Sequence, residues 1–117
     1  MTLEADLFAA LQAQCPRTFP DVAPVNTPRP YVVWQQVGGP APVYVEGALP
    51  NKVAAYVQIT VWDDERKDAN ALMRIIEAAL VASNTLQARP LGGLIGAIDD
   101  GNVLRGCHQD FEIWAAR

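Results

Sequence analysis

Two long segments of the chain alternate apolar and polar residues, the pattern of strands that bury only one face of a sheet. In the segment from Lys52 to Trp62 the odd positions are apolar, whereas Gln58 and Thr60 are among the even positions. The segment from Val103 to Ala115 repeats the pattern, with Cys107, Phe111 and Ile113 alternating with His108, Asp110 and Glu112. Each segment is therefore expected to form a long strand with one face in the core.

Two other segments repeat apolar residues every three or four positions, which predicts amphipathic helices. The first helix is expected to run from Thr2, a suitable N-cap, to about Gln14, before Pro16 stops it. The second is expected to follow a cap at Asp63 or Asp64, because acidic residues in the first turn suit the helix dipole. The two apolar stripes are Leu3, Leu7, Phe8 and Leu11, and then Ala69, Leu72, Met73, Ile76 and Leu80.

Shorter β-type segments lie between these elements. The segment from Tyr31 to Val37 is β-branched and aromatic, which favours a strand. The proline-rich region before it suggests a short edge strand around residues 18–23. An apolar, glycine-weakened segment follows the second helix at residues 91–98, and residues 99–102 have the composition of a tight turn.

These elements predict one α+β domain over residues 1–117. Strands grouped together, with helices outside them, imply a mainly antiparallel sheet of about four to five strands with two helices packed on one face. The expected core between sheet and helices consists of Val57, Ile59, Leu72, Ile76, Phe111 and Ile113.

The segment from Gly38 to Asn51 is longer than a hairpin needs, since two to five residues could join its flanking strands. It nevertheless contains the apolar residues Val43, Tyr44, Val45 and Leu49. We therefore expect an extended arm that contacts a neighbouring subunit. The alternative is that Val43 and Val45 extend the hairpin and pack on their own sheet.

Composition and charge argue against several classes of function. The 117 residues include nine Lys and Arg but thirteen Asp and Glu, for a net charge of −4, so specific nucleic-acid binding is not expected. The N-terminus lacks the basic region of a signal peptide, and no apolar run approaches the roughly 20 residues of a membrane span. Cys15 and Cys107 are expected to be buried free thiols, with a single disulfide as the alternative.

Two groups of polar residues are candidates for a chemical site. His108, Asp110 and Glu112 would share one strand face, where a carboxylate could polarise the imidazole. The neighbouring Cys107 would point to the opposite face, and the sequence places no other Ser or Cys nucleophile beside His108. The acidic run of Asp63, Asp64, Glu65 and Asp68 does not have calcium-loop spacing, and helix capping explains most of it. We therefore expect no catalytic residue, no metal site and no cofactor.

Three aromatic residues lie in the polar phase of their strands: Tyr56, Trp62 and Trp114. A sheet covered by helices on one face would leave these rings on its other face, and exposed aromatic rings among polar neighbours are typical of interface anchors. The alternative is that the rings curl over the sheet edge into a minor core. The interface expected from the sequence consists of Val43, Tyr44, Val45, Glu46, Leu49, Tyr56, Trp62 and Trp114.

Five segments resemble the tail-completion, or tail-terminator, proteins of long-tailed phages, the group that includes the phage lambda tail terminator. They are LEADLFAALQA (3–13), RPYVVWQQV (29–37), VQITVWDD (57–64), ANALMRIIEAAL (69–80) and QDFEIW (109–114). The resemblance implies a structural subunit that forms a ring, usually six-fold, on the end of the tail tube. Such a ring ends tube polymerisation and presents a surface for head attachment.

The resemblance also implies partners and a location. The partners would be further copies of the chain, the tail-tube protein and a head-completion or connector protein, with no membrane. The chain would be found in the host cytoplasm during assembly and then in the virion tail. A small ligand-binding or immunity-type α+β protein, acting as a monomer or dimer without enzymatic activity, remains the alternative.

Overall fold

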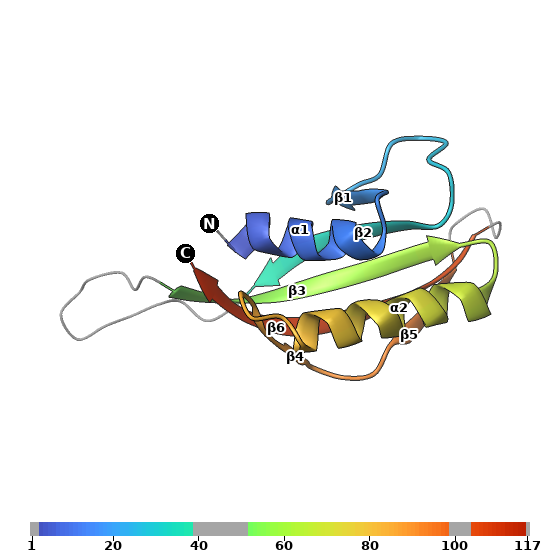
Figure 1. The fold of residues 1–117 in the computed structure, drawn as a ribbon. Coiled ribbons are helices and arrows are strands. Elements are labelled where there is room, and N and C mark those ends of the chain that lie inside the picture. The colour runs from blue at the N-terminus through green and yellow to red at the C-terminus, as the bar shows by residue number, and fades with distance from the viewer. Residues whose placement is uncertain (1–2, 39–51, 99–103, 117) are drawn as a thin grey trace.

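The computed structural model describes residues 3–38, 52–98 and 104–116, and within them two helices cover one face of a six-stranded sheet (Figure 1). The elements in chain order are α1 (Leu3–Gln14), β1 (Thr18–Pro20), β2 (Tyr31–Gly38), β3 (Lys52–Asp63), α2 (Arg66–Val81), β4 (Gln87–Pro90), β5 (Ile95–Ile98) and β6 (Arg105–Ala116). The expected α+β architecture, with both helices on the same side, is confirmed.

The two long strands form the centre of the sheet. β3 and β6 are antiparallel neighbours over their whole lengths, from the pair Lys52–Ala116 to the pair Asp63–Arg105. β2 lies on the outer side of β3, and the full order is β1-β2-β3-β6-β4, with β5 also pairing with β6. The alternating pattern of the sequence is confirmed, because the apolar positions described in both central strands are buried.

β1 is the edge strand that the proline-rich region suggested, but it is short and runs parallel to β2. Hydrogen bonds hold it in place: the Thr18 hydroxyl donates to the Cys15 carbonyl at 2.6 Å, and the Val32 amide donates to the Arg17 carbonyl at 2.9 Å. The strand ends at Pro20, and the residues that follow carry the chain back to the start of β2 (Figure 1). This return explains why the two strands are parallel.

β4 was not expected from the sequence, because its four residues, QARP, have no apolar alternation. It becomes a strand by pairing with one half of the outer edge of β6, while β5 pairs with the other half. Between the two, the Leu91 amide donates to the Asp110 carbonyl at 2.9 Å. The apolar segment expected at residues 91–98 is therefore strand only at its end.

The core lies between the helices and the sheet. Buried residues on the helices are Leu3, Leu7 and Leu11 of α1 and Ala69, Met73, Ile76 and Leu80 of α2. Five of the six residues expected in the core are fully buried: Val57, Ile59, Ile76, Phe111 and Ile113. The sixth, Leu72, packs against the core but is partly exposed. Phe8 has the same marginal position on α1.

The start of α2 differs from the expectation. The N-cap is Glu65, which makes no side-chain capping bond, and the helix itself begins at Arg66. Asp63 still belongs to β3, and its carboxylate accepts a hydrogen bond from the Asp64 amide at 2.7 Å. Asp64 pairs instead with Arg29, Nε to Oδ1, at 2.7 Å. The predicted cap at these two aspartates is thus wrong, because β3 continues further than its apolar pattern indicated.

Gln109 is a polar residue on the buried face of β6, with 2 % of its surface exposed. Its side-chain amide donates to Oε2 of Glu77 on α2 at 2.6 Å and to the carbonyl oxygen of Gly92 at 2.8 Å. A buried amide is tolerated only when it is hydrogen-bonded. These two bonds fasten the β4–β5 connection and α2 to the same strand.

Replacing Ile76 by alanine should lower the free energy of unfolding by about 2–5 kcal/mol, because a fully buried branched side chain is lost from a packed core. The neighbouring Ile75 is 53 % exposed and supplies a matched control, since Ile75→Ala should change stability by less than about 0.5 kcal/mol. Urea denaturation measures both. Equal losses in the two variants would contradict the orientation of α2.

Candidate interaction surface

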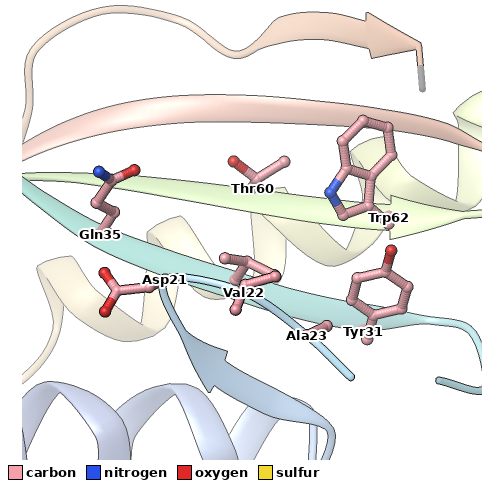
Figure 2. A pocket seen from close by; sticks show the side chains of 8 residues that line it. Asp21, Val22, Ala23, Tyr31, Gln35, Thr60 and Trp62 are labelled. Atoms are coloured by element: carbon pink, nitrogen blue, oxygen red, sulfur yellow. The ribbon is translucent and has the colours of Figure 1, made fainter. Parts of the chain in front are cut away.

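The face of the sheet opposite the helices carries aromatic and polar side chains (Figure 2). On β3 and β6 it is formed by the even positions, from Tyr56 to Trp62 and from His108 to Trp114. In the part of the chain that the structure describes, no helix covers this face, which we call the open face. The aromatic residues that the sequence analysis expected to form an interface, Tyr56, Trp62 and Trp114, lie on this face.

Trp62 is half-buried on the open face because its indole lies over Gly106 of β6. A β-carbon at Gly106 would lie 2.7 Å from Cε3 of the Trp62 ring and 2.5 Å from the Val61 carbonyl oxygen. Tyr31 is the direct cross-strand partner of Trp62 on β2, and the two rings stand together in Figure 2. Glycine at position 106 therefore lets the indole lie against the sheet.

An open hollow of about 300 Å³ extends along β2 and β3 from this aromatic pair. Its lining residues are Asp21, Val22, Ala23, Tyr31, Val33, Gln35, Thr60 and Trp62. Tyr31 and Trp62 stand at one end, whereas Gln35 and Asp21 lie at the other (Figure 2). The hollow thus combines an aromatic end with an end that contains a carboxylate.

Residues 21–23 form the wall of the hollow, where the chain leaves β1 and passes beside β2 (Figure 2). Asp21 has a φ of 64°, a left-handed conformation that aspartate tolerates better than most residues. Its amide donates to the Trp34 carbonyl at 2.9 Å, and the Val22 amide donates to the Pro20 carbonyl at 2.7 Å. The segment is therefore held in place while the Val22 side chain stays 76 % exposed. The sequence contained no signal for this wall.

The other candidate anchors divide into two groups. Trp114 is 39 % exposed on β6, and Tyr56 is partly exposed on β3. Val43, Tyr44, Val45, Glu46 and Leu49 lie outside the described residues, as does the turn expected at residues 99–102. The interface assigned to these eight residues stays a prediction.

The polar residues around His108 are engaged in separate contacts. His108 Nδ1 lies 3.3 Å from the Gln58 side-chain amide, whereas Glu112 forms an ion pair with Arg89 at 2.7 Å. Asp110 is exposed on the same strand. Within residues 3–38, 52–98 and 104–116, no group of three or more His, Cys, Asp or Glu residues is placed to hold a metal ion.

Both cysteines are buried and free, as expected. The Cys15 thiol lies 3.7 Å from the Pro30 carbonyl oxygen, and the Cys107 thiol lies 3.5 Å from the Ala69 carbonyl oxygen. Burial raises the pKa of Cys107 from 9.0 to about 11, because it penalises the thiolate, and the nearby Arg74 opposes this shift only in part. Cys107 is thus held as a neutral thiol in the core.

Comparison with known protein families identifies the family of this chain. The family model described as Tail completion protein gp17 matches residues 4–103, which is most of the chain. The chain belongs to this family. Its members have a structural role in the phage tail, and membership implies contacts with other tail or head proteins and a place in the virion tail.

The family match agrees with the resemblance seen in the sequence. No individual curated protein matches the chain. None of the helices in the described part of the chain combines the length and the apolar composition that crossing a membrane requires.

Gly106→Ala should displace the Trp62 ring and lower the free energy of unfolding by about 1–3 kcal/mol, because a methyl group there would overlap the indole and a backbone carbonyl. Gly96 on β5 is the matched control, since a β-carbon there meets nothing within 4 Å. Chemical denaturation and the tryptophan emission maximum measure the two effects. A Gly106→Ala protein with unchanged stability and emission would contradict the packing of Trp62.

Stability should fall as pH rises from about 9 to about 11, because the Cys107 thiol ionises in the unfolded chain at a lower pH than in the folded chain. The unfolded state then binds fewer protons, which favours unfolding as pH increases. Cys107→Ala removes this contribution, so its stability should decline less steeply over the same interval. Parallel pH profiles for the two proteins, measured by urea denaturation, would contradict the raised pKa of the thiol.

Proposed function

We propose that this chain assembles as a ring, with six-fold symmetry, on the end of a phage tail tube. The ring would stop further addition of tube subunits and present a surface for joining the head. The observation that carries the proposal is the family match over residues 4–103, since tail completion is the role that the family's name describes.

The open face supports an assembly role. It exposes Trp114 and partly exposes Tyr56, and it carries a hollow with an aromatic end. Aromatic side chains provide a large contact area at little entropic cost, which is why they dominate the energy of many interfaces. A protein that worked alone would gain little from keeping these rings outside its core.

Several partners and properties follow from the proposal. The chain would bind further copies of itself, the tail-tube protein and a head-completion or connector protein. It would be assembled in the host cytoplasm, and it would have no enzymatic activity and no cofactor. Its net charge of −4 suits a ring through which DNA passes without being held.

We also propose that the segment between β2 and β3 takes part in the ring. Its apolar residues and Glu46 lie outside the described residues, and the proposal rests on sequence and length alone. The proposed interface consists of Val43, Tyr44, Val45, Glu46, Leu49, Tyr56, Trp62 and Trp114. An arm of this kind would extend one subunit's contacts onto its neighbour.

A second candidate function is a small non-enzymatic binding protein of the ligand-binding or immunity type. The hollow of about 300 Å³ favours it, because that is the lower end of the volume range of ligand pockets. Light scattering over a wide concentration range separates the two functions. A dimer that persisted at nanomolar concentration would favour the second candidate over a ring formed on a template.

Negative-stain imaging of the protein mixed with purified tail tubes from the same phage tests the ring directly. Tubes should acquire a disc of density at one end, and added tube protein should no longer lengthen that end. Tubes that bind no protein at either end would overturn the proposal.

Shortening residues 40–49 to a tight turn should abolish ring formation on tubes while leaving the free energy of unfolding nearly unchanged. The expected reason is that the arm contributes to contacts between subunits and not to its own core. Denaturation and imaging of the same preparation measure both properties. Normal ring formation by the shortened protein would show that the segment is only a connection.

A further inference from the structure

Exposed charged side chains without an ion-pair partner lie on both sides of the sheet. Among the described residues, Arg29 and Arg89 are in ion pairs, whereas the three exposed cations of α2, Arg66, Lys67 and Arg74, are in none. On the other side, Asp21 beside the hollow and Asp110 on β6 are exposed carboxylates without an ion-pair partner. The helix side also carries the exposed carboxylates of Glu4 and Asp68, so the charge complementarity is local: Arg74 on α2 is a cation without an ion pair, and Asp21 beside the hollow is a carboxylate without one.

The outer surface of α2 is unusually apolar around Arg74. Ala71 and Ala78 are exposed and lie opposite the buried stripe of the helix, with Arg74 and Ile75 flanking them on either side. Ile75 is 53 % exposed, and Val81 in the last turn is 55 % exposed. From Ala69 to Val81 the only other charged residue is Glu77, which accepts the hydrogen bond from Gln109. An arginine among apolar neighbours is a common composition for the centre of an interface.

The hollow on the open face offers groups that complement this helix surface. At one end Asp21 supplies a carboxylate for a guanidinium, and at the other Tyr31 and Trp62 supply apolar area (Figure 2). Val22 on the wall is 76 % exposed and adds further apolar surface between them. Arg74 and Ile75, which point to different sides of the α2 surface, match these two ends.

We infer that the outer face of α2 in one copy of the chain docks into the hollow of the next copy, with Arg74 paired to Asp21 and Ile75 against the aromatic end. The inference rests on the proposed ring function and specifies the contact between its subunits. The two surfaces are different and lie on opposite sides of the molecule, so each copy can bind two neighbours. Head-to-tail contacts of this type produce a closed ring when the rotation between copies closes, and an open filament when it does not.

Disulfide trapping between copies tests the contact. Val22→Cys places a thiol on the wall of the hollow, and Ala78→Cys places one on the outer α2 face, one turn after Arg74 and Ile75. An oxidised mixture of the two single variants should form a covalent dimer, whereas either variant alone should not. The wild-type chain controls for Cys15 and Cys107, which are buried, and Glu4→Cys on α1 replaces Ala78→Cys as the control for position. The mixtures are oxidised both at high concentration in solution and on tail tubes.

Each outcome has a defined meaning. A dimer in the mixture alone supports the inference, whereas a dimer from a single variant indicates a two-fold contact and overturns it. No dimer in solution or on tubes overturns it as well. A chain with both cysteines distinguishes the contact from the ring: a ladder that stops at a fixed size supports both, and an open-ended ladder supports the contact while contradicting the ring.

Charge substitution provides a second measurement. Arg74→Glu should raise the concentration needed for half-maximal assembly by at least about tenfold, and Arg74→Lys by less. In an Asp21→Asn background the effect of Arg74→Glu should shrink, because the repulsion between two carboxylates is removed. Glu4→Lys, a charge reversal on the outside of α1, is the matched control and should have little effect. Equal effects of Arg74→Glu in both backgrounds would overturn the pairing with Asp21.

Discussion

The fold depends on the pairing of β3 with β6. Each strand is paired along its whole length, and each has one apolar face, so their register places Val57 beside Phe111 and Ala55 beside Ile113 on the side of the helices. A shift of one strand by one residue would turn its apolar face toward solvent, which makes this register strongly determined. The helices, the edge strands and the open face are all arranged around this pair.

The same pairing places two kinds of surface on opposite sides of one sheet. The side chains at the odd positions of β3 and β6 point into the core. The aromatic and ionisable residues at the even positions therefore face away from the helices. A sheet covered on one face only must either leave the other face to solvent or bury it against a partner. Membership of a tail completion family implies contacts with other tail or head proteins, and we propose that the open face makes some of them.

Small backbone features then shape the open face into a specific surface. Gly106 allows the Trp62 ring to lie against β6, and the left-handed Asp21 turns the chain beside β2 to make a wall. On the other side of the sheet, Gln109 joins α2 to the β4–β5 connection through two hydrogen bonds. Hydrogen bonds thus connect the helical layer to the sheet layer, in addition to the packing of the core between them.

The sequence by itself determined the elements whose apolar periodicity is strong. Apolar spacing alone predicts the two long strands, the apolar stripes of both helices and most of the expected core residues. It does so because burial of apolar area is the largest favourable contribution to folding. Tyr56, Trp62 and Trp114 could be placed outside the core for the same reason, since the side chains of a strand alternate between its faces.

Only the tertiary structure decided the rest. β4 is a strand because β6 offers an unpaired edge, not because QARP favours one, and β1 is parallel because of the path its connection takes. Asp64 is paired with Arg29, which is far away in the sequence, and the N-cap of α2 is Glu65. The hollow likewise joins Asp21 with Tyr31 and Trp62 from three separate segments. Such contacts depend on which distant groups the folded chain brings together, and local spacing carries no information about them.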